Sequence, residues 1–204
     1  MRVILRDQAI VVVPDVDTSD DAQHLWAWTG HGFRADRRGG ALVLTDLGPL
    51  EELLAVPINV TSRHVDPGVR LISNFAHTPF DLHGERFASV EGFWQCLRTA
   101  EPDERARVAA LSGAVAKTAA RTLGTPARVQ FQGKDVAWAS PEHWDLMREA
   151  CRAKFAQVGE ARAALLATGQ RPLVHRTRTD SRSIPGQVMA SIWTGLRAEL
   201  RARR

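Results

Sequence analysis

Apolar residues recur every three or four positions through most of the chain after about residue 69, the spacing of helices with one buried face. The clearest stripe runs along residues 144–158, behind Ser140 and Pro141, a pair typical of a helix start. The other predicted elements are helices over about 90–98, from Pro102 to near 124, over 161–168 and from about 188 to 200, and a strand over 172–175.

The first 65 residues follow a different pattern, with short β-branched runs in place of helical stripes. The expected elements are a hairpin or two edge strands at 3–5 and 10–13, a loop at 30–40, a strand at 41–44, a short helix at 50–56 and an extended piece at 58–60. We therefore expect a small N-terminal α/β extension over residues 1–65 and a main domain over 66–204. The predicted fold class is α+β, mostly helical.

The composition is that of a folded globular chain. With 204 residues, 44% of them hydrophobic and 25% charged, it excludes intrinsic disorder, and its two cysteines exclude a disulfide scaffold. No apolar run reaches the roughly 18 residues that span a bilayer, and the start of the chain does not resemble a signal peptide. We expect a cytoplasmic protein without membrane contact, in which Cys96 and Cys151 are reduced.

The basic residues are mostly arginine. Only three of the 27 Lys and Arg residues are lysines, the net charge is +4, and the pI is near 9.8. This balance suits an anionic partner such as phosphate or nucleic acid, although GC-rich coding also favours arginine.

Two segments carry candidate chemistry. Glu91, Gln95 and Arg98 share one helical face, which is either solvated or directed into a polar pocket. Asp180 follows the strand predicted at 172–175, where it either caps a turn or serves a site. The arginines around it, Arg176, Arg178 and Arg182, either bind a diphosphate or are solvated. The histidines and cysteines lack metal-ligand spacing, and no dinucleotide, P-loop or serine-hydrolase motif occurs, so we expect neither metal nor cofactor.

Several short motifs resemble the NADAR superfamily, also called YbiA-like. They occur in the family's order over about residues 69–200: residues 71–75 with Pro79-Phe80, Ser89-Val90-Glu91 with Phe93-Trp94-Gln95, Ala116-Lys117, Trp144 with Met147, Lys154-Phe155, residues 165–169, and residues 173–175 with Asp180. In the family the first of these forms a strand and the second a helix. Two departures stand out: His175 where the family often has Glu, and residues 181–186 where it has a Trp-Gly pair.

The resemblance implies cleavage of an N-glycosidic bond. The substrates it suggests are ADP-ribose on guanine bases in nucleic acid, or phosphoribosylated intermediates of riboflavin synthesis. The first would reverse DNA ADP-ribosylation in an antitoxin- or repair-like role, with an ADP-ribosyltransferase toxin as a partner. A non-catalytic ADP-ribose or nucleic-acid binding module is the alternative from another class.

The resemblance also distributes roles among these residues. Glu91 and Asp180 would be the catalytic carboxyl groups, and Lys154 either a phosphate contact, a Schiff-base nucleophile or a helix residue that packs beside Phe155. The residues expected to bind substrate are Asn74, Phe75, Trp94, Gln95, Arg98, Lys117, Trp144 and Arg178. For Trp94 and Trp144, packing in the core is the alternative to stacking on a base.

Overall fold

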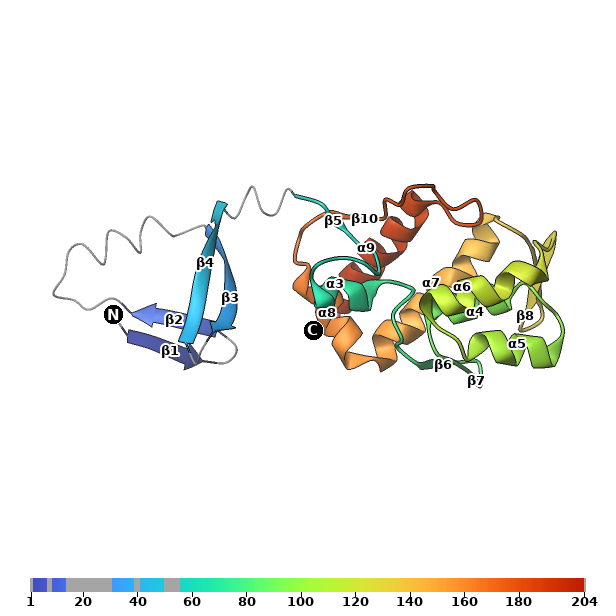
Figure 1. Ribbon diagram of the computed structural model, residues 1–204, viewed down its shortest axis with the longest axis horizontal. Coiled ribbons are helices and arrows are strands. Elements are labelled where there is room, and N and C mark those ends of the chain that lie inside the picture. The colour runs from blue at the N-terminus through green and yellow to red at the C-terminus, as the bar shows by residue number, and fades with distance from the viewer. Residues whose placement is uncertain (1, 7–8, 14–30, 39–40, 50–55, 204) are drawn as a thin grey trace. The chain divides into compact units, whose positions relative to one another are not determined.

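The computed structural model describes residues 2–6, 9–13, 31–38, 41–49 and 56–203, with side-chain environments for 56–203 (Figure 1). The chain divides into two compact units, Met1–Val56 and Pro57–Arg204. The second unit begins earlier than the boundary predicted after residue 65, because β5 (Ile58–Asn59) pairs in parallel with β10 (Leu173–Val174) near the other end of the chain.

The first unit contains two antiparallel strand pairs. Strand β1 (Arg2–Arg6) pairs with β2 (Ala9–Val13), which confirms the predicted hairpin. Strand β3 (His31–Arg38) pairs with β4 (Ala41–Pro49), so the loop predicted at 30–40 is wrong. The sequence Gly-Gly at 39–40 is itself a hairpin signal and favours pairing of the runs on either side. The helix predicted at 50–56 falls largely outside the described residues.

The second unit is an α+β domain built mainly of helices, which confirms the predicted fold class (Figure 1). Its helices are α3 (Pro67–Ile72), α4 (Val90–Cys96), α5 (Pro102–Ala109), α6 (Gly113–Ala119), the 3₁₀ turn η1 (Ala120–Leu123), α7 (Pro141–Gln157), α8 (Gly159–Ala167) and α9 (Gly186–Ala202). Its antiparallel hairpins are β6 (Phe80–Leu82) with β7 (Glu85–Phe87), and β8 (Arg128–Phe131) with β9 (Lys134–Ala137).

Two predicted boundaries need correction. The helix expected from 102 to 124 is interrupted at residues 110–112, because the chain turns at Gly113, which has φ +57° and lies against Phe75. The run 71–75, expected as a strand from the family resemblance, is the end of α3 and the loop that follows it.

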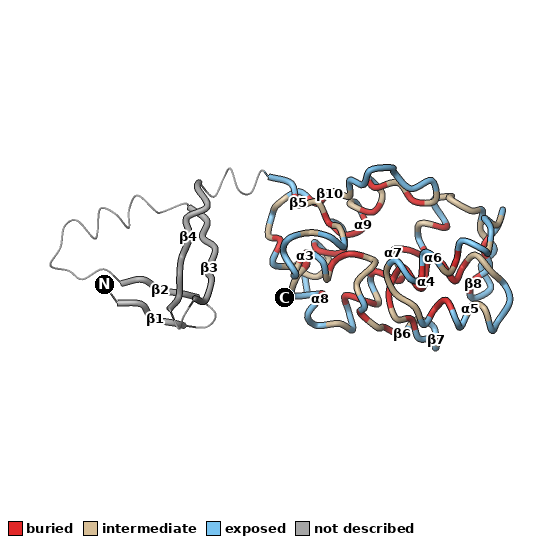
Figure 2. Tube along the Cα trace, viewed as in Figure 1, coloured by how far each residue is buried: buried red, intermediate tan, exposed pale blue. Residues whose placement is uncertain are grey.

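Helix α4 is the centre of the core, because all seven of its residues are buried (Figure 2). Phe87, Phe93 and Phe131 form two edge-to-face pairs around it, with ring centroids 5.1 and 5.3 Å apart. The Ser89 hydroxyl caps the helix by accepting from the Gly92 N–H at 2.9 Å. A buried helix with a defined start gives its side chains fixed positions, which matters for the polar residues that it carries.

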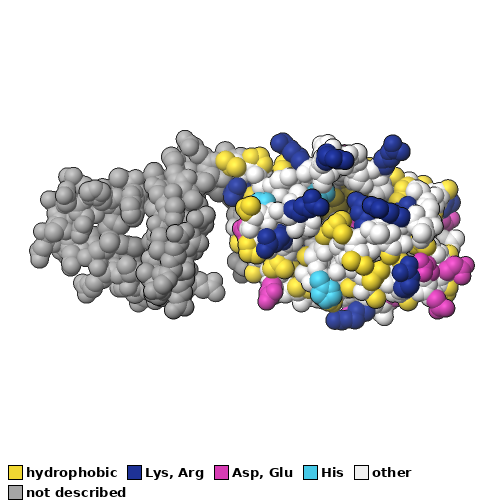
Figure 3. Space-filling model, viewed as in Figure 1, with side chains coloured by type: hydrophobic (Ala, Val, Ile, Leu, Met, Phe, Trp, Pro, Cys, Tyr) yellow, Lys and Arg dark blue, Asp and Glu magenta, His cyan; other side chains and the backbone are white. Residues whose placement is uncertain are grey.

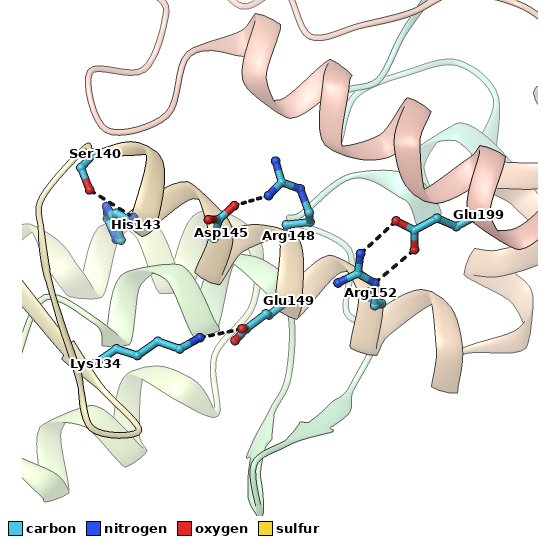
Figure 4. A network of polar contacts seen from close by, with 8 residues as sticks. All are labelled: Lys134, Ser140, His143, Asp145, Arg148, Glu149, Arg152 and Glu199. Carbon is cyan, nitrogen blue, oxygen red and sulfur yellow. Dashed lines mark hydrogen bonds and ion pairs between the residues drawn. The ribbon is translucent and has the colours of Figure 1, made fainter.

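Polar contacts cap helix α7 and join it to its neighbours (Figure 4). Ser140 caps its first turn by accepting from the His143 N–H, Glu149 pairs with Lys134 of β9 at 2.7 Å, and Arg152 pairs with Glu199 of α9 at 2.9 Å. The inner face of α7 carries the predicted stripe, with Met147, Cys151 and Phe155 buried.

None of the helices in the described residues is long and apolar enough to cross a bilayer.

Candidate functional site

A cavity of about 250 Å³ opens between α4, α6, α9 and the loops at 73–75 and 181–184. Its polar lining includes Asn74, Glu91, Gln95, Arg98, Lys117 and Arg182. Its aromatic lining consists of Phe75, Trp94, Trp138 and Trp193. Seven of the predicted site residues therefore share one pocket, and the helical face with Glu91 is directed into it.

Glu91 sits at the bottom of this pocket. Its backbone N–H donates to the carbonyl oxygen of Asn74 at 2.9 Å, and its side chain is only 7% exposed. Burial raises the pKa of Glu91, while the hydrogen bond from Gln95 and the charges of Lys117 and Arg98 act in the opposite direction. A buried carboxyl group with a raised pKa keeps its proton to a higher pH than a free one, and such groups are common among general acids and bases.

Gln95 and Arg98 continue the polar line from Glu91. The Gln95 Nε2 donates to Glu91 Oε1 at 2.8 Å, and Arg98 Nη1 donates to Gln95 Oε1 at 3.2 Å. Arg98 also donates from Nε to the Gly124 carbonyl at 2.7 Å and from Nη2 to the Thr125 hydroxyl at 3.0 Å. Each nitrogen of this guanidinium thus has an acceptor within the protein itself.

The aromatic wall is built from segments far apart in sequence. Trp94 of α4 stacks on His143 of α7, with centroids 4.0 Å apart and planes 14° apart, and Trp138 lies 4.6 Å from the same imidazole. Burial lowers the pKa of His143 to about 4, so the ring is neutral at physiological pH. Its Nδ1 accepts from the Ala139 N–H at 3.1 Å. The buried, uncharged His143 ring thus packs against the two tryptophans and supports them from outside the pocket.

Cationic side chains lie at the solvent side of the pocket. Lys117 and Arg182 both line it and are exposed, and Lys117 Nζ lies 5.8 Å from the Phe75 ring centroid. Arg178 is exposed as well but does not line the pocket. Lys and Arg side chains are spread over the face of the second unit shown in Figure 3, whereas Asp and Glu lie mainly near its edges.

The structure separates Asp180 from Glu91. Asp180 Oδ1 accepts from the Ser181 N–H at 2.8 Å and from the Gly186 N–H at 2.9 Å, so it fixes the turn that leads into α9. It is exposed and borders a neighbouring pocket, which shares only His175 with the one that holds Glu91. The structure does not bring the expected carboxyl pair, Glu91 and Asp180, together in one pocket. Asp180 instead caps the turn before α9, as the alternative interpretation of the sequence had it.

Lys154 also lies away from the pocket. It is completely buried, and its Nζ donates to the carbonyl oxygens of Ile72 at 3.2 Å and Ser73 at 2.9 Å. Burial lowers its pKa to about 7. Through these two bonds Lys154 holds the backbone at the end of α3, next to the loop that carries Asn74.

Trp144 does not line the pocket either, and its role is to hold the pocket's rim. Its indole Nε1 donates to the Ser183 carbonyl at 2.9 Å, while Trp94 Nε1 donates to the Ser183 hydroxyl at 3.3 Å. The loop 181–184 thus rests on two tryptophans. This loop replaces the Trp-Gly segment of the NADAR pattern.

The sequence did not indicate several lining residues. Trp138, Thr125 and Met189 line the pocket from the end of the β8–β9 hairpin, the turn after η1 and the start of α9, whereas Arg182 is one of the arginines around Asp180 that the sequence offered as phosphate contacts. The tryptophan count was the one available signal for Trp138, and it does not specify a position. Among the described residues, no group of three or more His, Cys, Asp or Glu is arranged to hold a metal ion.

The fold and the pocket together define a YbiA-like protein of the NADAR type, an α+β domain with a buried glutamate on its central helix. N-glycosidase YbiA of Escherichia coli (strain K12) is 33% identical to this chain over 114 residues, which is 53% of this chain and 64% of the relative. N-glycosidase YbiA of Shigella boydii serotype 4 (strain Sb227) is 33% identical over 110 residues, with the same coverage. The chain thus spans slightly less than two-thirds of the length of these relatives.

The NMR structure of the E. coli protein YbiA has a TM-score of 0.54 and 25% sequence identity, and the match covers 74% of this chain and 90% of that one. A family model described as bacteriophage protein GP30.3 matches residues 67–184. The chain belongs to this family. The matched residues include Glu91 and most of the pocket but end before Met189 and Trp193 of α9.

Proposed function

We propose that the protein hydrolyses N-glycosidic bonds and removes ADP-ribose from guanine bases in nucleic acid. The observation that carries this proposal is Glu91, a buried carboxyl group facing a pocket with an aromatic wall and cations at its opening. The relatives named N-glycosidase support the reaction type. The identity of the substrate is an inference from the pocket's chemistry and from the NADAR resemblance.

The proposed reaction needs one carboxyl group and water. The bond between the anomeric carbon and the guanine nitrogen breaks, and the carbon gains positive charge in an oxocarbenium-like transition state. Ionised Glu91 stabilises this charge and takes a proton from the attacking water, whose oxygen bonds to the anomeric carbon. The bond's electron pair stays on the guanine, which receives a proton from solvent or from protonated Glu91.

The size of the cavity favours a substrate of which only one part lies inside the pocket. The cavity has a volume of about 250 Å³, slightly below the roughly 300–1,000 Å³ typical of small-ligand pockets, so we expect it to take the ribose and the base but not a whole ADP-ribose. The remaining phosphates would lie at the opening, where Lys117 and Arg182 are exposed. Lysine and arginine are the usual phosphate contacts in proteins.

The exposed arginines next to the pocket favour a polyanionic substrate. Arg176, Arg178 and Arg182 are exposed on the loop between β10 and α9, and this loop borders the pocket that holds Glu91. A polynucleotide can contact such a loop with phosphates flanking the modified guanine. On this reading the protein reverses DNA ADP-ribosylation in the cytoplasm, in an antitoxin- or repair-like role opposite an ADP-ribosyltransferase toxin.

A phosphoribosylated intermediate of riboflavin synthesis is the second candidate substrate. The small volume of the cavity favours it, because a mononucleotide-sized molecule would fill the space without a polymer. A non-catalytic binding module for ADP-ribose or nucleic acid is the third candidate. Asp180 and Lys154 lie outside the pocket, so a single carboxyl group would have to carry the catalysis.

The decisive experiment uses an oligonucleotide that carries ADP-ribose on one guanine. Incubation with the purified protein, followed by mass spectrometry, should show loss of the ADP-ribose mass, and Glu91→Gln should abolish it. Turnover of the riboflavin intermediates alone would establish the second candidate. Binding without turnover of either substrate would establish the third. Borohydride added during turnover tests a Schiff-base route, and we expect no adduct on buried Lys154.

A further inference from the structure

The Glu91 carboxylate is held on one oxygen by a side-chain amide. Gln95 Nε2 lies 2.8 Å from Glu91 Oε1, and both groups are buried. An amide presents a donor at one end and an acceptor at the other, and the two ends have nearly the same shape. The Gln95 side chain can therefore stabilise either form of Glu91: its NH₂ group favours the ionised carboxylate, and its carbonyl favours the protonated acid.

Arg98 decides between these two orientations. A guanidinium has donors only, and Arg98 Nη1 lies 3.2 Å from Gln95 Oε1. A reversed amide would place two donors against each other at this position. The arginine therefore keeps the carbonyl of Gln95 on its own side and the NH₂ group on the side of Glu91.

Arg98 is itself held in place from outside α4. The Gly124 carbonyl accepts from its Nε at 2.7 Å and the Thr125 hydroxyl accepts from Nη2 at 3.0 Å, so the turn after η1 orients the guanidinium. The Trp138 ring centroid lies 5.7 Å from its central carbon. Three of the five N–H donors of Arg98 are thus used within the protein, and together they fix the plane of the guanidinium.

We infer that Arg98 is a positioning residue, which orients the Gln95 amide so that the amide holds Glu91 as a carboxylate. The sequence had suggested instead that Arg98 binds substrate. The relay of Arg98, Gln95 and Glu91 is a property of the protein alone. Its kinetic consequence rests on the proposed function.

Other charges face the same carboxyl group and must be kept constant in a test. Lys117 of α6 lowers the pKa of Glu91, as does the charge of Arg98 itself. Arg182 on the loop before α9 and His175 after β10 line the same pocket. A change at Arg98 therefore removes both a charge and the orientation of the amide, and the experiment has to separate the two.

A double-mutant cycle with NMR as its readout separates the effect of the Arg98 charge from the effect of the amide orientation. The Glu91 carboxyl signal of ¹³C-glutamate-labelled protein, assigned with Glu91→Gln, is titrated in wild type, Arg98→Met, Gln95→Leu and the double variant. Loss of one hydrogen bond should raise the pKa of Glu91 by about 0.5–1 pH unit in each single variant. In the double variant the shift should be clearly smaller than the sum, because the methionine can no longer act through the amide.

Two further variants complete the design. Arg98→Lys keeps a donor and a charge near Gln95, so it should restore most of the wild-type pKa. Thr125→Val removes one of the two contacts of Arg98 with the turn and keeps the bond to the Gly124 carbonyl, so it should change the pKa of Glu91 little. Arg86→Met, at an exposed ion pair on the β6–β7 hairpin, is the matched control for loss of an arginine.

Additive shifts in the cycle, or an unchanged Glu91 pKa in Arg98→Met, would overturn the relay. With active enzyme, Arg98→Met should move the acid limb of the kcat profile to higher pH and leave KM within about twofold. A rise in KM with unchanged kcat would make Arg98 a substrate contact instead. If neither substrate class turns over, the proposed function fails, and the NMR cycle still decides the relay.

Discussion

The carbonyl oxygen of Leu111 occupies the space that a side chain at Gly92 would need. The carbonyl of Ala109 also lies only 3.0 Å from the position of a Cβ at this glycine. The Ser89 hydroxyl, which caps α4, lies 3.2 Å from the same Leu111 oxygen. Helix α4 is thus seated backbone to backbone against the segment after α5, and the position of Glu91 depends on this contact.

Gly92→Ala should therefore destabilise the protein, although alanine is the better helix former. The methyl group meets backbone atoms that cannot turn aside, and such overpacking typically costs about 1–3 kcal/mol. Gly195→Ala in α9 is the matched control, because nothing lies within 4 Å of its added Cβ. That variant should gain roughly 0.5–1 kcal/mol from helix propensity. Urea unfolding of both variants measures the contrast, and equal effects would contradict the close contact at α4.

Glu91→Gln should lose activity and gain stability at neutral pH. Burial raises the pKa of Glu91 above its usual value of 4.5, so between these two pKa values the folded protein binds more protons than the unfolded chain. Wild type should then lose stability as the pH rises from about 4.5 through the raised pKa, whereas the amide variant should not. Turnover should fall by about 10²–10⁴-fold, the typical contribution of a general acid or base.

Urea midpoints of both proteins between pH 4 and 8 test the stability half of this prediction. Glu104→Gln is the control with the opposite sign, because Arg107 lowers the pKa of that exposed carboxyl group. A stability difference between wild type and Glu91→Gln that stays constant with pH would mean that burial does not perturb Glu91.

The sequence predicted the parts of this fold that depend on local periodicity. Helices α4 and α7 follow from their apolar stripes, and Ser89 and Ser140 cap them as such residues do. The shared helical face of Glu91, Gln95 and Arg98 followed from the same spacing. The short hairpins β6–β7 and β8–β9 were missed, because strands of three or four residues carry too few positions to show an alternation.

Three predicted site residues from the family motifs do not line the pocket that holds Glu91, and the reason is the same for all three. Asp180, Lys154 and Trp144 stand in motifs, and a motif does not specify the direction in which a side chain points. Asp180 caps the turn before α9, Lys154 binds the carbonyls at the end of α3, and Trp144 holds Ser183. Distances between such segments depend on tertiary packing, and the spacing of motifs along the sequence does not determine that packing.

Lys154→Met should change the pH dependence of stability at alkaline pH. Because burial lowers the pKa of Lys154 to about 7, the unfolded chain binds more protons than the folded protein between about pH 7 and the usual lysine value of 10.5. Wild type should therefore gain stability relative to the variant as the pH rises through this window, with a slope of up to about 1.4 kcal/mol per pH unit.

Thermal or urea unfolding from pH 6.5 to 9.5 checks this slope. At pH 9 the variant should be the less stable protein, because the carbonyls of Ile72 and Ser73 lose their donor in a buried site. Lys134→Met, at an exposed ion pair with Glu149, is the control. Parallel stability curves for wild type and Lys154→Met would show that Lys154 keeps an ordinary pKa.

Trp138→Ala should weaken ligand binding more than it weakens the fold. Trp138 is partly exposed and lines the pocket, and its six-membered and five-membered rings provide a surface for a base. Stacking on an aromatic side chain contributes about 1–3 kcal/mol per base, so affinity should fall by about 5- to 150-fold. Calorimetric titration of guanosine-linked ADP-ribose into the Glu91→Gln background measures this without turnover.

Trp144→Phe is the matched variant against which the loss of affinity in Trp138→Ala is compared. Its indole donates to the Ser183 carbonyl from outside the pocket, so the variant should lose about 1 kcal/mol of stability and keep most of its affinity. A larger loss of affinity in Trp144→Phe than in Trp138→Ala would transfer the stacking role to Trp144.

Arg182→Ala should reduce the salt dependence of nucleic-acid binding. Each phosphate contact to a single strand releases bound counterions and contributes about 0.7 to the slope of log K against log salt. Arg182 lines the pocket from an exposed position, whereas Arg128 pairs with Asp135 on the β8–β9 hairpin at 2.9 Å. We therefore expect the slope to fall by about 0.7 in Arg182→Ala and to stay unchanged in Arg128→Ala. Fluorescence anisotropy with a labelled single strand carrying ADP-ribosylated guanine, between 50 and about 200 mM salt, measures both slopes. If the arginine contacts only a small metabolite, the strand should bind the two variants and wild type with the same slope, and the riboflavin intermediates become the stronger candidates.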